Sequence, residues 1–207
     1  SDVYAIVKKG EKYVNVGKIN IETYAWRTQK VKFVPVVNDY GVDEKAISET
    51  LNRIYGRFGI TYEVSKDDRF ESENINSEFL NNFSVSSGTF TKQSDDMKRL
   101  QYYYKEERGL EDSTAYIFLL KSAVDYPAID GDMPQGQICG YIFMHSDNGT
   151  LSDGRLVAHE LAHGIYRLDH VFEKAYGIPE NSTDNLLDYN NGDQLAHFQW
   201  ELIKNPG

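Results

Sequence analysis

The amino-acid sequence predicts an α/β domain of the α+β type, in which helices pack on a mixed β-sheet. Residues 31–37 and 60–64 are rich in β-forming residues and flank a helical pattern over residues 43–58. This order is typical of a β-α-β unit with parallel strands and a right-handed crossover. Residues 114–121, TAYIFLLK, are almost continuously apolar, as a strand buried on both faces would be. Residues 155–164 have helical spacing and no strand-like alternation.

Residues 1–28 are predicted to form a β-hairpin appendage, because β-forming residues flank a Lys-Lys-Gly turn. Residues 29–207 then form the main domain, since 207 residues with 40% hydrophobic composition suit one packed core. Its first strand, 31–37, contains Pro35, which favours an edge or bulged position because proline cannot donate to a sheet ladder.

The long helix after this strand is predicted to start at Asp43 and to end before Gly59. Its apolar side chains form one stripe, made of Ile47, Leu51, Ile54, Tyr55 and Phe58. Further along the chain, residues 137–144 are predicted to be a strand and residues 194–203 a packing helix.

Residues 65–113 form a polar insertion rich in Ser, Asn, Asp and Glu. One amphipathic stretch, residues 95–110, is predicted to be a helix that ends at Gly109. The insertion is a lid, a wall of a substrate cleft or a solvated segment. The solvated segment is favoured because long polar insertions usually lie on the surface.

Composition excludes several classes of function. A net charge of −10 without a basic stripe argues against nucleic acid or anionic membranes as the main partner. Cys139 is the only cysteine, which excludes an intrachain disulfide framework and a thiolate zinc cluster. The longest apolar run, residues 115–120, is too short to span a bilayer. The chain opens with Ser1, and we predict a secreted or cell-surface protein preceded by a leader or upstream domains.

The sequence HELAHG, residues 159–164, lies on the predicted helix 155–164. His159 and His163 are four residues apart, about 6 Å along the axis and about 40° around it, so both imidazoles project from one face. Two histidines at this spacing can bind one zinc ion. Glu160 is placed to act as general base on a metal-bound water. We therefore predict Zn²⁺ as cofactor.

A catalytic zinc ion needs a third protein ligand, for which His170 and Asp169 compete. On a continuous helix His170 would lie about 10 Å beyond His163, out of reach of a shared ion. The helix must therefore end and the chain fold back, with Gly164 as the residue best able to absorb an unusual backbone angle. His170 is favoured over Asp169 because imidazole suits zinc well.

With these residues the chain resembles the metzincin superfamily of zinc endopeptidases, whose pattern is HExxHxxGxxH followed by a turn that contains methionine. The match covers His159, Glu160 and His163. It departs at Tyr166, which stands in the place of the glycine, and His170 comes one residue late. More narrowly, the chain is similar to uncharacterised bacterial metallopeptidase-like domains.

A second point of resemblance is DNLLDY, residues 184–189, which is similar to the metzincin methionine turn. Leu187 stands in the methionine position, and the resemblance implies that Tyr189 stabilises the oxyanion. It also implies a zincin-like twisted mixed sheet whose antiparallel edge strand, residues 137–144, pairs with extended substrate. Gly140 and Tyr141 would then contact the peptide.

The resulting hypothesis is a zinc metallopeptidase that acts on protein or peptide substrates. Its metal ligands are His159, His163 and His170, and its catalytic residues are Glu160 and Tyr189. Two alternatives remain at this point. One is a zinc hydrolase of another zincin clan with an acidic third ligand such as Asp169, and the other is a non-catalytic zinc-containing binding module.

Overall fold

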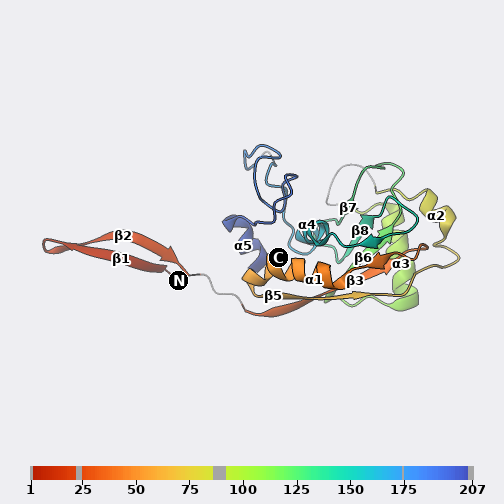
Figure 1. Ribbon diagram of the computed structural model, residues 1–207, viewed down its shortest axis with the longest axis horizontal. Helices are drawn as coiled ribbons and strands as arrows, with labels where there is room; N and C mark the ends of the chain where they lie inside the picture. The colour runs from red at the N-terminus through yellow and green to blue at the C-terminus, as the bar shows by residue number, and fades with distance from the viewer. Residues whose placement is uncertain (1, 22–24, 86–91, 174, 205–207) are drawn as a thin grey trace.

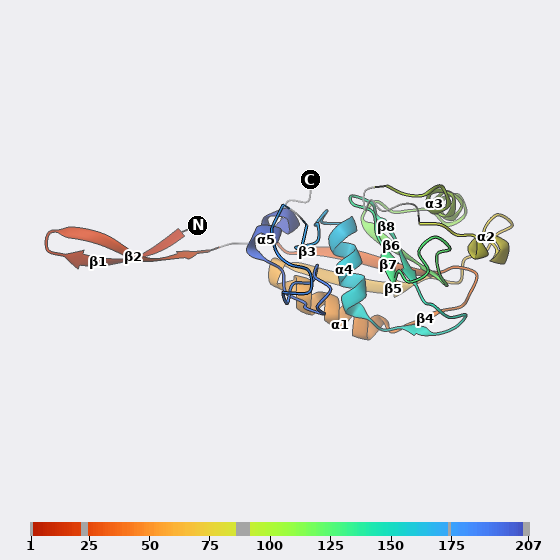
Figure 2. The ribbon, with the colours of Figure 1, turned by 90° about the horizontal axis from the view of Figure 1, so that it is seen from above.

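The computed structural model describes residues 2–21, 25–85, 92–173 and 175–204. The main body is a five-stranded sheet of order β5-β3-β6-β8-β7 with helices on both faces (Figures 1 and 2). Four strands are parallel and β7 is antiparallel, which confirms the predicted mixed α+β class. The strands are β3 (Arg27–Pro35), β5 (Ile60–Lys66), β6 (Thr114–Leu120), β7 (Gly131–Asp132) and β8 (Cys139–Phe143).

The predicted β-α-β unit is present. Strands β3 and β5 pair in parallel and are joined by α1 (Glu44–Tyr55) and the short 3-10 helix η1 (Gly56–Phe58). Asp43 caps α1 by accepting a hydrogen bond from the backbone N–H of Ala46. Gly59 ends the helical segment with a left-handed φ of 72°.

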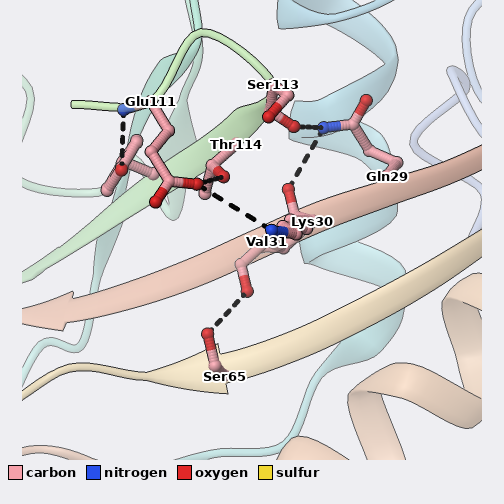
Figure 3. Close-up of polar contacts among 8 residues, drawn as sticks. Gln29, Lys30, Val31, Ser65, Glu111, Ser113 and Thr114 are labelled. Carbon is pink, nitrogen blue, oxygen red and sulfur yellow. Dashed lines mark hydrogen bonds and ion pairs between the residues drawn. The ribbon is translucent and has the colours of Figure 1, made fainter.

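The expected edge position of the first strand is wrong, because β3 lies between β5 and β6. Pro35 is tolerated there because it is the last residue of β3 and lies beyond Phe33, the last residue that pairs with β5. Polar contacts join β3 to β5 on one side and to the loop that precedes β6 on the other (Figure 3). They run from Gln29 Nε2 to Ser113 O, from Lys30 Nζ to the Glu111 carboxylate and from Ser65 Oγ to Val31 O.

The central strand β6 is buried along its whole length and supplies both hydrophobic cores. Ala115, Ile117 and Leu119 pack in the core shared with α1 and α4 (Gly154–Gly164). Tyr116, Phe118 and Leu120 pack in the core on the opposite face. This alternation follows from the period of two of a β-strand and accounts for the continuous apolar run.

The polar insertion is a covering layer rather than a solvated segment or a lid. It contains α2 (Ser77–Asn81) and α3 (Asp95–Arg108), and it fills the second core. Its buried side chains are Phe70, Ile75, Phe79, Phe83, Val85, Met97, Leu100 and Tyr104. The prediction of a solvated insertion failed because these apolar residues are spread among many polar ones without a clear period.

The antiparallel edge of the sheet is β7, so the edge position expected for residues 137–144 is also wrong. Within that stretch β8 pairs in parallel with β6 and is covered on its other side by β7. The sequence did not predict β7, because a strand of two residues within a Gly- and Pro-containing loop has no hydrophobic periodicity.

Shorter elements complete the body and lead to the candidate site. Strands β4 (Gly41–Val42) and β9 (Thr150–Leu151) pair in parallel just before α1 and α4. Helix α5 (His197–Lys204) lies against η1, where the Phe58 and Trp200 rings pack 5.6 Å apart. No helix in the described part of the chain is long and apolar enough to cross a membrane.

The N-terminal residues form an antiparallel hairpin of β1 (Asp2–Lys9) and β2 (Lys12–Asn20), which projects from one end of the body (Figures 1 and 2). The body begins earlier than predicted, because Arg27 and Thr28 already pair with β5.

We predict that Gly59→Ala lowers the free energy of unfolding by about 1 kcal/mol, because a Cβ atom is strained at φ 72°. Gly56→Ala is the matched control, since its φ is −59° and no atom lies within 4 Å of an added Cβ. Chemical denaturation of both variants checks this, and equal losses would contradict it.

Candidate metal centre

Helix α4 places His159 and His163 one turn apart on a buried face. Asp153 caps the helix by accepting hydrogen bonds from the backbone N–H groups of Arg155 and Leu156. The two imidazoles meet with their Nε2 atoms 3.1 Å apart. Both side chains are buried, so this is not a solvated helix face.

After α4 the chain reverses and returns His170 to the same point. Leu168 N–H donates to Ala162 O, and Arg167 adopts a left-handed φ of 55°. His170 Nε2 then lies 3.3 Å from His159 Nε2. The three histidines are buried, and their ligand atoms all lie within 4.8 Å of one another, so the cluster could hold a metal ion.

The alternative third ligand, Asp169, is not part of this cluster. Its side chain is exposed, and its Oδ1 accepts a hydrogen bond from Gln135 Nε2 at 2.7 Å. The structure therefore brings together the favoured histidine and not the competing carboxylate.

The hinge role expected of Gly164 is wrong. Gly164 is the last residue of α4, and the left-handed residue of the reversal is Arg167. Gly164 matters through its size instead, because an added Cβ would collide with the Met133 side chain. The glycine lets the segment that connects β7 and β8 pack directly on the helix.

The hydrogen bonds of the imidazoles fix which nitrogen faces the cluster. His159 Nδ1 lies 2.9 Å from Leu186 O, and His163 Nδ1 lies 2.6 Å from Leu168 O. A carbonyl oxygen only accepts, so each Nδ1 carries the proton and each Nε2 presents a lone pair. Two lone pairs therefore face each other at 3.1 Å, an arrangement that a cation between them would satisfy.

Burial keeps the triad neutral. It lowers the pKa of His159 to about 3 and the pKa values of His163 and His170 to about 4, with the neighbouring imidazoles as the second cause. Metal binding requires neutral imidazole, so the three ligands are ready to bind at neutral pH without losing protons.

Glu160 lies beside the triad. Burial raises the pKa of its carboxyl group well above the usual value, and the nearby Asp132 raises it further, although a hydrogen bond from Met133 N–H lowers it. Gly131 lies against this side chain, because a Cβ added there would be 2.7 Å from Glu160 Oε1. Strand β7 and its continuation thus hold the glutamate in place.

A cavity of about 320 Å³ opens over the triad, between β7 and the turn that contains Tyr189. It is lined by Ala128, Ile129, Asp130, Gly131, Arg155, Leu156, His159, Glu160, His163, His170 and Tyr189. The triad and Glu160 therefore line a cavity with room for a small molecule.

The turn beside the cavity is organised by a buried carboxylate that sequence reasoning missed. Asp188 accepts hydrogen bonds from the backbone N–H groups of residues 181, 182, 183 and 189 and from the Thr183 hydroxyl group. Burial alone would raise the pKa of Asp188, but these hydrogen bonds lower it overall. Arg155 joins this turn to α4 by donating to the carbonyl groups of Leu186, Asp188 and Gly192.

The turn brings Tyr189 to the site. Its half-exposed ring lies 6.2 Å from the His159 ring and 5.1 Å from the His170 ring. Leu187 is fully buried in the core on the α4 face. Phe172, which the sequence did not single out, stacks on His170 with ring centroids 4.7 Å apart.

Gly140 and Tyr141 do not reach the cavity. Both are buried in β8, and the Tyr141 hydroxyl group bonds with Gln101 and Met97 of α3 on the opposite face of the sheet. Their predicted contact with substrate depended on an edge position that β8 does not have.

No protein-family model matches this chain, and no curated protein matches it.

We predict that the chelated, metal-free protein loses stability as the pH falls from about 7 to about 4. The folded-state pKa values of the triad are about 3 to 4, against about 6.5 in the unfolded chain, so unfolding takes up as many as three protons in this window. Each proton contributes ~1.4 kcal/mol per pH unit to the slope. Denaturation midpoints determined in EDTA between pH 7 and pH 4 measure this dependence of the free energy of unfolding on pH.

His170→Asn should reduce this slope by about one proton. His145→Asn, at an exposed histidine outside the cluster, is the matched control variant. An identical slope in the native chain and in His170→Asn would show that the triad is not the source.

Proposed function

We propose that this chain is a zinc-dependent endopeptidase related to the metzincins. The observation that carries the proposal is the convergence of three neutral imidazole Nε2 atoms beside a buried glutamate at an open cavity. When bound, a zinc ion would supply Lewis acidity, which lowers the pKa of water and polarises a peptide carbonyl group.

The donor set supports zinc and a catalytic rather than a structural site. Imidazole nitrogen suits zinc, whereas calcium and magnesium prefer oxygen ligands. Structural zinc sites use four protein ligands, and catalytic sites use three with one position open. Among the described residues, the group capable of holding a metal contains three, His159, His163 and His170.

Glu160 is the proposed general base. Its raised pKa suits a group that takes a proton from water and passes it to the leaving amine. The Met133 N–H and the Gly131 backbone orient its carboxyl group. Tyr189, which lines the cavity, is the proposed donor of a hydrogen bond to the oxyanion of the transition state.

Strand β7 is the proposed backbone partner of an extended peptide, in place of residues 137–144. It is the antiparallel edge of the sheet, and Gly131 lines the cavity directly. A substrate strand laid along this edge would pass over Glu160 and the triad.

The reversal after α4 supports the relation to metzincins. The third histidine, His170, comes one residue later than in the metzincin pattern. The left-handed residue, Arg167, likewise follows Tyr166, which stands in the glycine position. One additional residue in the loop accounts for both shifts.

We predict that Glu160→Gln lowers kcat by about 10²- to 10⁴-fold, the usual contribution of a general base. Zinc affinity should stay within a few-fold, because Glu160 is not a ligand. Metal analysis and cleavage of a fluorogenic peptide library check this. Glu106→Gln, an exposed glutamate on α3, is the matched control. Native-like turnover in Glu160→Gln would refute the proposed mechanism.

We predict that Gly131→Ala displaces Glu160, because the new Cβ would lie 2.7 Å from its carboxylate oxygen. Since a small misplacement of a catalytic group is costly, kcat should fall by about 10- to 100-fold while zinc still binds. Gly56→Ala, where an added Cβ meets no atom within 4 Å, serves as control. Loss of zinc together with activity would indicate that the variant disturbs the triad instead.

A further inference from the structure

The N-terminal hairpin exposes apolar side chains that nothing in the described chain covers. Every described side chain of β1 and β2 is exposed, including large apolar ones. These are Val3, Tyr4, Ile6, Val7, Tyr13, Val14, Val16 and Ile19. Figures 1 and 2 show the hairpin extending away from the body. A lone two-stranded hairpin is at best marginally stable in water, so further strands would stabilise it.

The outer edge of β1 can accept another strand. Lys9 and Lys12 face each other across the two-residue loop of Gly10 and Glu11. In an antiparallel ladder the pair that flanks such a loop is hydrogen-bonded, and the pattern then alternates. The odd-numbered residues of β1 therefore bond to β2. The backbone N–H and C=O groups of the even-numbered residues point outward.

The sequence of this edge is nearly symmetric in polarity about its centre, and its two ends carry opposite charges. Residues 2–8 read DVYAIVK, with Ala5 at the centre, an acid at one end and a base at the other. We propose that β1 pairs antiparallel with β1 of a second copy of this chain, with the two-fold axis at Ala5. An interface of this kind is isologous, since the same residues serve both copies.

This register satisfies charge and hydrogen bonding together. It sets Asp2 opposite Lys8 of the second copy at both ends, and it sets Tyr4 opposite Ile6. All of these residues are even-numbered, so their outward backbone groups meet as hydrogen-bonded pairs. Val3 and Val7 meet on the other face, which extends the aliphatic face of the hairpin across four strands.

The outer edge of β2 does not offer such a match. Self-pairing around Asn15 would place Lys12 opposite Lys18, a like-charge pair. The ladder between β1 and β2 also shifts register between Ala5 and Ile6, where Val16 is the additional residue of β2. A bulge of this kind disturbs the regular edge that a second strand needs.

Charge reversal tests the proposal on the full chain. Lys8→Asp leaves two acids on the edge. Asp2→Lys leaves two bases and also removes the ion pair between Asp2 and Lys18 of its own hairpin. Each variant alone should sediment as a monomer, and mixing the two distinguishes lost charge pairing from a disturbed hairpin. An equimolar mixture restores both opposite-charge pairs and should form heterodimers. The native chain should form dimers as its concentration rises from micromolar to millimolar, because edge pairing buries less area than a standard interface. A native monomer throughout, or native-like dimers of either single variant, would overturn the proposal.

Cross-linking locates the axis. Ala5→Cys places two thiols in a non-hydrogen-bonded pair, where Cα atoms lie about 4.5 Å apart and a disulfide can form. Val3→Cys is the matched control, because Val3 faces Val7 of the second copy rather than itself. Rapid oxidation to a covalent dimer is expected for Ala5→Cys and not for Val3→Cys. Equal or reversed yields would exclude an axis at Ala5. The native Cys139 is buried in β8 and does not interfere.

Discussion

Three buried imidazoles whose ring nitrogens meet at one point, two of them with their lone pairs directed inward, form the constraint on which the rest of the site depends. Protonation would relieve the repulsion between them only at low pH, because burial lowers the pKa values to about 3 or 4. A bound cation would relieve it at neutral pH. The carbonyl groups of Leu186 and Leu168 fix the proton on the opposite nitrogen, so the turn and the reversal are both needed to form the site.

The reversal itself is anchored by a buried cluster of tyrosines. The Tyr166 hydroxyl group bonds with that of Tyr62 on β5 at 2.7 Å, and its ring lies 5.2 Å from that of Tyr55 on α1. Tyr55 in turn donates to Ala158 O of α4. Tyr166 therefore ties the reversal to the sheet and both helices. A large anchored side chain can fix the position of His170 as well as a tight glycine turn can.

Local sequence patterns predicted the helices and strands that have a regular hydrophobic spacing or a helix-capping residue in their own sequence. The helix after Asp43, the central strand and the histidine helix all follow from spacing. The choice of His170 over Asp169 followed from the preference of zinc for imidazole, and the chain reversal followed from the reach of that side chain. The sequence could not predict features that depend on tertiary contact. Arg167 has no intrinsic preference for a left-handed angle, and Asp188 looks like any acidic turn residue until the chain folds around it.

The position of the sheet edge shows how one such error propagates. Placing the edge at residues 137–144 predicts a peptide paired with β8, in the place that β7 occupies. With β7 as the edge, the strand that would hold a peptide is also the strand that packs on Glu160. Gly131 has no side chain, so the edge can approach the carboxyl group closely, and Met133 N–H binds that group two residues later. A peptide aligned along β7 would therefore be aligned with the proposed base by the same backbone, so that binding and orientation would be achieved together.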